Sequence, residues 1–547
     1  MRRGGEGIAR QEFVVTTDDQ LHLDGEVPPD PGPDGPPPPA RSAARSVGIN
    51  ALSNWGGMAV DLACKLFLLS YLFRQLGREE YGIVQLAMSV AQMAAFLQFG
   101  LGGSVLRLAS EALAARDWSR LSDLLSCVRT ILLGLAAVAW GAAVVVSLFF
   151  LDALKVPPES QSAAATLIQL TGFYAACHMA STWALGTLRA AERYYLANLI
   201  TVGENVLQAT IIVALFAAGW GRLETVGVAY AAGGLGMLIA STRMVRRLFP
   251  ELRLRLFRIT RDALREVIEF GFLVAVVTTA RTVQNQVGVP IISATLGPAA
   301  VPLLAIPRQI GGQFMRVIAG LTQPLRPVAT RFAVLGQRDR MARMYTATLR
   351  FTGVITVGML VVLLVYGKPI LRVLTDRAMA EESYAVLVVY LALAGVNLLG
   401  FPAVSIIMGA GSIRGLTLFQ TVTLGVSIVL AIAIAVWTDW GIVGLVAGLN
   451  GPSVFYTLGY LSWRVRKETG VRVAVTLLGC VLPPILGAAP AVGAGLAMRH
   501  AWPVEGWVSL IAQMMACAAV YAAVAWLLVL KSEERQMLWR LVGRRAR

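Results

Sequence analysis

The sequence predicts an all-α, polytopic membrane protein, and its composition carries this prediction. Of the 547 residues, 56% are apolar and 15% are charged, against about 25% charged residues in an ordinary soluble domain. The mean hydropathy is +0.65, yet the net charge is +16, so the charged residues must be segregated from the apolar ones. This combination excludes a soluble globular enzyme and a disordered chain. It also argues against a nucleic-acid partner, since such proteins carry their basic patches on polar surfaces.

Residues 1–46 differ from the rest of the chain. Eight of the 24 prolines lie between Pro28 and Pro39, charges of both signs are mixed, and apolar periodicity is absent. Such a segment buries too little apolar surface to offset the entropy lost on ordering. We therefore expect a disordered cytoplasmic tail. A signal peptide is excluded, because no apolar stretch follows the first residues.

From residue 47 onward the chain is a series of apolar runs of about 20 residues, the length that a helix needs to cross a bilayer. The connections between the runs are short. We expect about 14 transmembrane helices, at 48–75, 81–107, 124–151, 163–188, 195–218, 224–243, 267–290, 298–328, 349–374, 383–409, 415–437, 441–463, 473–498 and 506–530.

The basic residues predict the orientation of these helices. With the N-terminus in the cytoplasm, 35 of the 48 Lys and Arg residues fall on the cytoplasmic side, 8 fall outside, and 5 lie within spans. Cytoplasmic loops carry such an excess of basic residues. We therefore expect a multi-pass membrane protein with both termini in the cytoplasm.

An internal repeat predicts how the helices are grouped. Leu76 and Gly77 match Leu296 and Gly297 further along the chain, and the neighbouring loops and spans follow in the same order. Six spans fit within that interval, which indicates a parallel repeat like those of two-lobed transporters. We expect two six-helix lobes around a central cavity plus two C-terminal helices. The predicted parts are 1–46 (tail), 47–243 (first lobe), 244–266 (basic linker), 267–466 (second lobe), 467–530 (last two helices) and 531–547 (basic C-terminal tail).

Two basic segments flank these lobes. The first runs from Arg243, at the end of the first lobe, through the linker to Arg265 and holds eight arginines interleaved with Leu, Phe and Ile; the C-terminal tail from Lys531 is similar. Both segments are expected either to lie on anionic lipid headgroups or to be ordinary basic cytoplasmic loops.

Five cations fall within predicted spans, where a charge costs about 2.5–3.5 kcal/mol on insertion scales. Span 298–328 holds three of them on one helical face: Arg308 and Arg326 are 18 residues apart and eclipse, and Arg316 lies about 80° away. Arg281 and Lys65 are the other two. The functional interpretation is a cationic, water-filled cavity for an anionic ligand, because arginine binds phosphate bidentately.

Alternative structural roles exist for some of these charges. Lys65 follows Asp61 by one turn, so the two could simply neutralise each other. Arg326 lies near enough to the cytoplasm for its charge to reach water. Glu204 is a carboxylate in the middle of a span; it is either a proton or cation site or an ion-pair partner for an arginine. Together with Asp61 it is the candidate for H⁺ or Na⁺ coupling.

Other chemistry is not indicated by the sequence. The five cysteines are scattered over apolar spans, the three histidines lack metal-ligand spacing, and no phosphate-binding glycine loop is present. We therefore expect no metal site, no cofactor and no catalytic residues.

The segment from Phe73 to Asp117 resembles the polysaccharide transporter family, the Wzx-type lipid-linked oligosaccharide flippases of the multidrug/oligosaccharidyl-lipid/polysaccharide exporter superfamily. The resemblance rests on a turn and a span end with the family's pattern, formed here by Leu76, Gly77, Tyr81, Gly82, Phe99, Gly100 and Leu101. The Pro-rich tail departs from the family pattern, and so does the concentration of cations in the second lobe.

The resemblance implies that the chain moves polyprenyl-pyrophosphate-linked oligosaccharide across the inner membrane for O-antigen, capsule or exopolysaccharide synthesis, by alternating access. The implied partners are the lipid-linked substrate, membrane lipids and other polysaccharide assembly proteins. Arg281, Arg308, Arg316, Lys65 and Arg326 would then hold the pyrophosphate or an anionic glycan.

Two other functions remain open. One is a multidrug or cation antiporter of the same superfamily, which would need carboxylates in its spans. The other is a membrane glycan polymerase or ligase, an enzyme that usually needs a longer outer loop than the predicted ones near 152–162 and 375–382.

Overall fold

The computed structural model describes residues 40–93, 97–98, 101–255, 259–262, 264–266, 284, 286–322, 325–411, 413–530, 532 and 534–536. Three candidate residues, Arg281, Phe99 and Gly100, lie outside these ranges. So do residues 1–39 of the predicted tail, most of the predicted span 267–290 and residues 537–547.

The fold is all-α, with no strand among the described residues, as the sequence predicts. The principal helices are α1 (Ala40–Met93), α2 (Leu101–Ala114), α3 (Trp118–Phe149), α4 (Gln161–Ala190), α5 (Tyr194–Ala217), α6 (Leu223–Leu248), α8 (Gly288–Leu296), α9 (Val301–Thr322), α10 (Leu325–Val334), α11 (Arg338–Leu374), α12 (Arg377–Leu398), α13 (Phe401–Gly409), α14 (Ile413–Trp437), α15 (Gly441–Phe455), α16 (Ser462–Thr469), α17 (Val473–Leu486), α18 (Ala489–Ala501) and α19 (Trp507–Val524). Two π-helical stretches, η4 (Tyr456–Leu461) and η5 (Ala525–Val529), continue α15 and α19.

Ten helices of the described chain are long and apolar enough to cross a membrane, which confirms a polytopic membrane protein. The difference from the fourteen predicted spans has physical causes. The first two predicted spans meet at the non-helical Gly77 and are counted together as one apolar helix, and α4 carries too many polar residues to count as apolar. Span 267–290 lies mostly outside the described residues, and so do residues 323 and 324 within span 298–328.

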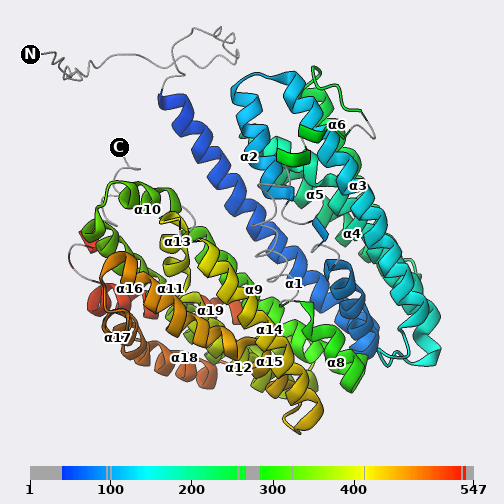
Figure 1. Cartoon of the computed structure of the whole chain (residues 1–547). Helices are drawn as coiled ribbons and strands as arrows, with labels where there is room; N and C mark the ends of the chain where they lie inside the picture. The colour runs from blue at the N-terminus through cyan, green and yellow to red at the C-terminus, as the bar shows by residue number, and fades with distance from the viewer. Residues whose placement is uncertain are drawn as a thin grey trace, which may run out of the picture. The chain divides into compact units, whose positions relative to one another are not determined.

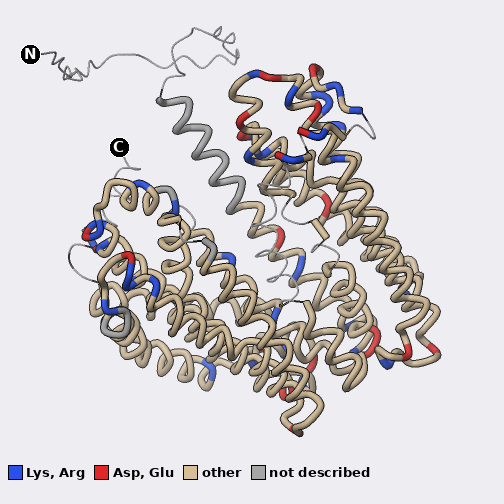
Figure 2. Tube along the Cα trace, in the orientation of Figure 1, with Lys and Arg blue, Asp and Glu red and all other residues tan. Residues whose placement is uncertain are grey.

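Residues 1–49 form one unit and Asn50–Arg547 form a second. In the second unit the turns fall alternately at two ends of the helices. The Gly77 end contains the turns at Gly77, Gly219, Gly297 and Gly441; the Arg116 end contains those at Arg116, Glu192, Gly336 and Gly411. Figure 2 shows that Lys and Arg gather at the Arg116 end of both halves, as a positive-inside orientation requires.

The backbone repeats at the interval found in the sequence. Gly77 has φ 78° and ψ −178°, and its match Gly297 has φ 87° and ψ 167°; only glycine adopts this conformation at low cost. Left-handed residues also recur at Arg116 and Gly336, which are separated by the same interval. The same turns are therefore built twice, once in residues 50–248 (the N-terminal half) and once in residues 286–469 (the C-terminal half).

Each half has its own packing centre. In the N-terminal half α4 packs against α2, α3 and α6, and its Trp183 is 1% exposed. In the C-terminal half α12 packs against α9, α11 and α15. Figure 1 shows α2–α6 on one side of α1 and α9–α19 on the other. As a result α1 faces the space between the halves.

Candidate functional site

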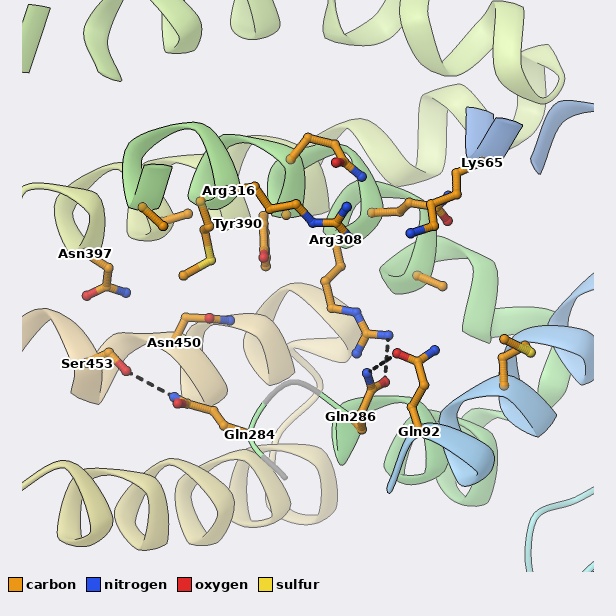
Figure 3. Close-up of a pocket in the computed structure, with 18 of the residues that line it drawn as sticks. Lys65, Gln92, Gln284, Gln286, Arg308, Arg316, Tyr390, Asn397, Asn450 and Ser453 are labelled. Atoms are coloured by element: carbon orange, nitrogen blue, oxygen red, sulfur yellow. Dashed lines mark hydrogen bonds between the residues drawn. The ribbon is translucent and has the colours of Figure 1, made fainter. Parts of the chain in front are cut away.

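A cavity of about 650 Å³ lies between the two halves. Its walls come from α1 and α6 in the N-terminal half and from α9, α12, α14 and α15 in the C-terminal half. Figure 3 shows the polar side chains that project into it. Three of the predicted cations line this cavity: Lys65, Arg308 and Arg316.

Lys65 and Arg316 share one carboxylate. Lys65 Nζ lies 2.8 Å from Asp61 Oδ1, and Arg316 Nη1 lies 2.7 Å from Asp61 Oδ2. Asn205 Nδ2 donates to Asp61 at 2.9 Å. The i,i+4 pair that the sequence allows is therefore formed, and Asp61 also supplies Arg316 with the acidic partner that its own span lacks. The two cations remain 38% and 46% exposed, so both face the cavity water while bound to Asp61.

Arg308 is linked to both halves through glutamines. Arg308 Nη2 donates to Gln286 Oε1 at 3.3 Å, and Gln286 Nε2 donates to Gln92 Oε1 at 2.8 Å. Ser89 Oγ donates to the carbonyl oxygen of Gln286 at 2.9 Å. This chain of hydrogen bonds fixes the guanidinium within the cavity (Figure 3).

The charges of the described lining are of one sign. Lys65, Arg308 and Arg316 line the cavity, whereas no Asp or Glu of the described residues does. Asp61 is not a lining residue, but it is bound to two that are, Lys65 and Arg316. The remaining polar lining is neutral and rich in amides: Gln85, Gln92, Gln284, Gln286, Gln309, Gln313, Gln420, Asn397 and Asn450. Such a site can bind an anion and hydrogen-bond to neutral hydroxyl groups.

Glu204 lies apart from the cavity in a buried polar cluster. It is 4% exposed and accepts a hydrogen bond from Gln208 Nε2 at 3.2 Å. The ring of Tyr174, on α4, lies 5.4 Å from that of Tyr230, and Tyr230 lines the cavity. Among the ion pairs of the described residues, none joins Glu204 to an arginine, and the hydrogen bond that it accepts comes from a neutral amide.

The motif residues of the first turn form a contact between the halves. Tyr81 is 1% exposed and lines the cavity, where its hydroxyl accepts from Gln85 at 2.8 Å. A Cβ built on Gly82 would lie 2.0 Å from the carbonyl oxygen of Pro298, so only glycine fits there. The turns that contain the repeat glycines, Gly77 and Gly297, are thus in contact.

Further bonds join the halves at the Gly77 end. Arg78 makes a bidentate pair with Glu382 at 2.7 and 3.1 Å, and its Nε donates to the Ala299 carbonyl at 2.8 Å. Lys155 Nζ donates to the Thr295 carbonyl at 2.6 Å. This end of the cavity is held closed.

The structure separates the predicted site residues into groups. Arg308, Arg316 and Lys65 come together around the cavity, with Asp61 bound to two of them. Arg326 is exposed, lies on α10, and is not part of the described lining. Among the described residues, no group of three or more His, Cys, Asp or Glu is placed to hold a metal ion.

Sequence reasoning did not identify most of the amides of the lining. Gln284 and Gln286 were noticeable as neighbours of Arg281, but Gln420, Asn397 and Asn450 are single amides in long apolar runs. The available signal was that amides are costly inside a membrane, which makes each of them a candidate.

Comparison with known proteins identifies a family and a shared fold. The sequence profile of a family described as "Polysaccharide biosynthesis protein" matches residues 55–333. A search of curated protein sequences found no significant match. Among solved structures, a multidrug resistance MATE family transporter of the MOP superfamily in an inward-facing conformation has a TM-score of 0.64 at 15% identity, covering 76% of this chain and 99% of that chain.

Two further structures have the same fold. The lipid II flippase MurJ in an inward closed conformation has a TM-score of 0.64 at 11% identity, covering 90% of this chain and 99% of that chain. A MOP superfamily transporter from Pyrococcus furiosus, described as having a binding pocket of reversed polarity, has a TM-score of 0.56 at 16% identity and covers 77% and 96%. At these identities the likeness shows the fold alone.

Proposed function

Because the chain belongs to the polysaccharide biosynthesis protein family, we propose that it is a flippase for polyprenyl-pyrophosphate-linked oligosaccharide. It would move this lipid from the cytoplasmic to the outer leaflet of the bacterial inner membrane, for synthesis of O-antigen, capsule or exopolysaccharide. Membrane lipids and other polysaccharide assembly proteins would be its neighbours.

The observation that carries the proposal is the sign of the charges around the cavity. Three cations face it, and the carboxylate of Asp61 is bound by two of them. A pyrophosphate can take over the bonds that Arg316 and Lys65 make with Asp61, because the guanidinium and ammonium groups remain partly exposed to the cavity. Arg308, which is oriented by Gln286, would bind the second phosphate.

Transport follows from the two-fold construction of the protein. The halves would rock about the cavity and expose it alternately at its two ends. With the Arg116 end in the cytoplasm, the contacts at the Gly77 end would close the outer side, and release would require the Arg78–Glu382 pair to part. An inside-negative potential would favour export of an anion by about 2.3 kcal/mol per charge per 100 mV.

A proton or Na⁺ would return the empty carrier. Glu204 is the candidate site, since it is a buried carboxylate surrounded by hydrogen-bonding groups, and Asp61 is the second candidate. An ion bound to either carboxylate would neutralise a negative charge in the N-terminal half. It would thereby shift the equilibrium between the carrier's conformations and couple its return to the ion gradient.

The multidrug or cation antiporter remains the second candidate function, and the fold that the chain shares with the MATE transporter favours it. A cationic drug would need a carboxylate in the cavity wall, whereas the described wall presents cations. A glycan polymerase or ligase would need an acid, base or nucleophile near its substrate, and the groups at this cavity suit binding better than catalysis.

Surface glycan output tests the proposal. Replacing Arg308 and Arg316 together by Gln should abolish surface glycan in the host while the protein is still inserted in the membrane. The control is Arg340→Gln, which removes an exposed arginine at the Arg116 end that bonds only locally, to Gln337. Normal glycan output from the double variant, or efflux of a cationic dye by the unaltered protein, would contradict the proposal.

A further inference from the structure

Charged and uncharged polar residues line different parts of the cavity wall. All three lining cations come from α1 and α9, whereas the polar residues that α12, α14, α15 and the adjoining π-helical stretch contribute to the described lining are uncharged. Figure 3 shows Asn397 and Ser453 at one side of the cavity and Lys65 at the other. The pyrophosphate-binding groups therefore occupy only part of the site.

One polar atom of the neutral wall is left without a partner. Oε1 of Gln420, on α14, is buried and accepts no hydrogen bond from the described residues, yet Gln420 lines the cavity. Leaving a buried acceptor unsatisfied costs about 1–3 kcal/mol, so such an atom needs an explanation. A ligand hydroxyl group provides one if the Gln420 amide turns toward the cavity on binding, so that Oε1 accepts from it.

Neighbouring groups on α15 are oriented by bonds of their own. Asn450 Nδ2 donates to the carbonyl oxygen of Val446 at 3.0 Å. Ser453 Oγ accepts from Gln284 Nε2 at 3.1 Å, so its own proton remains to be donated. These bonds fix the side chains before a ligand arrives, which reduces the entropy lost on binding.

An aromatic face adjoins these polar groups. Tyr456 lines the cavity, and its ring stacks on Tyr460 at 5.7 Å, which in turn stacks on Phe419 at 4.1 Å. Tyr456 and Tyr460 lie in the π-helical stretch η4, which begins four residues after Pro452. Such stretches are frequent at functional sites, and the stack holds the Tyr456 ring in place.

We propose that this neutral wall, formed by Gln420, Asn450, Ser453 and Tyr456, binds an uncharged sugar ring of the lipid-linked substrate and selects the glycan. The inference rests on the proposed function and adds a second subsite to it. Sugar rings present hydroxyl groups at their edges and C–H bonds on their faces, which match amides and hydroxyls beside an aromatic ring. A charged sugar would find no counter-charge among the described residues of this wall.

Two soluble probes separate the subsites: farnesyl pyrophosphate, and farnesyl pyrophosphate bearing one N-acetylglucosamine. Purified protein should bind the sugar-bearing probe about three- to tenfold more tightly, the effect of about one hydrogen bond. Gln420→Leu should remove this preference and leave the affinity for farnesyl pyrophosphate unchanged. Gln337→Leu, the same substitution in a turn outside the cavity, should change neither affinity.

Thermal stability distinguishes binding from a structural role. Because Gln420 Oε1 has no partner among the described residues of the ligand-free protein, Gln420→Leu should leave the melting temperature unchanged or raise it. A lower melting temperature, or weaker binding of farnesyl pyrophosphate by this variant, would assign Gln420 to structure and overturn the inference.

The remaining outcomes are also decisive. Equal affinity of the unaltered protein for the two probes would refute the sugar subsite alone, and so would a glucuronic acid probe bound as tightly as the N-acetylglucosamine one. Failure of the unaltered protein to bind farnesyl pyrophosphate would instead refute the proposed function, and the subsite with it. Arg308→Gln should weaken both probes by the same factor.

Discussion

Gly82→Ala should weaken the contact that closes the Gly77 end. The added Cβ would lie 2.0 Å from the backbone oxygen of Pro298, whereas ordinary contacts begin at 3.4 Å. The two turns must therefore separate by more than an ångström. Since both partners are backbone, no side-chain rotation relieves the clash. Overpacking of this kind costs about 1–3 kcal/mol, which would shift the ratio of closed to open states by about 5- to 150-fold.

Thiol labelling can measure this shift. Gln85→Cys, in a Cys64→Ser background, places a reporter on the cavity wall near the closed end, and the four other cysteines are buried. Gly82→Ala should raise the rate of labelling by a membrane-impermeant reagent added outside by at least about fivefold. The matched control is Gly134→Ala, where a Cβ meets nothing within 4 Å. Labelling of the Gly82 variant at the unaltered rate would refute the closure.

Three further predictions concern charged groups. Arg78→Glu should increase the same labelling, and adding Glu382→Arg should restore most of the closure. Since the pair is half-exposed, the effect on the closed state is about 0.5–1 kcal/mol. A double variant labelled as fast as the single one would contradict the pairing. Asp61→Asn removes the carboxylate that Lys65 and Arg316 share, so farnesyl pyrophosphate should bind about fivefold more tightly, as measured by calorimetry. This corresponds to a gain of about 1 kcal/mol in binding free energy after solvent screening. Unchanged or weaker binding would show that Asp61 does not compete with the ligand. Glu204→Gln should make glycan export insensitive to collapse of the H⁺ and Na⁺ gradients by ionophores; retained sensitivity would place the coupling site elsewhere.

Local patterns in the sequence predict much of the fold. Apolar run length gives the spans, and the Leu-Gly turns at Gly77 and Gly297 are found at the predicted interval because a positive φ requires glycine wherever the turn recurs. The described residues do not test whether Arg326 shares a helical face with Arg308 and Arg316, because residues 323 and 324 between α9 and α10 lie outside them.

The site could be predicted only in part, because its decisive contacts are distant in sequence. Arg316 and Asp61 are 255 residues apart, and Arg78 and Glu382 are 304 apart. Periodicity places residues on a helical face but does not say which other helix that face meets. Gln420 shows the same limit: its role depends on α14 lying beside α15 at the cavity, which the sequence of α14 alone does not contain.

The central claim is that a cationic cavity carries a lipid-linked, pyrophosphate-bearing glycan across the membrane. Translocation of a fluorescent polyprenyl-pyrophosphate-linked N-acetylglucosamine in proteoliposomes, followed by quenching of the exposed leaflet, tests it most directly. The account predicts that the unaltered protein and Arg340→Gln move the lipid, and that the double variant Arg308→Gln, Arg316→Gln does not. Equal translocation by the double variant, or none by the unaltered protein, would contradict it.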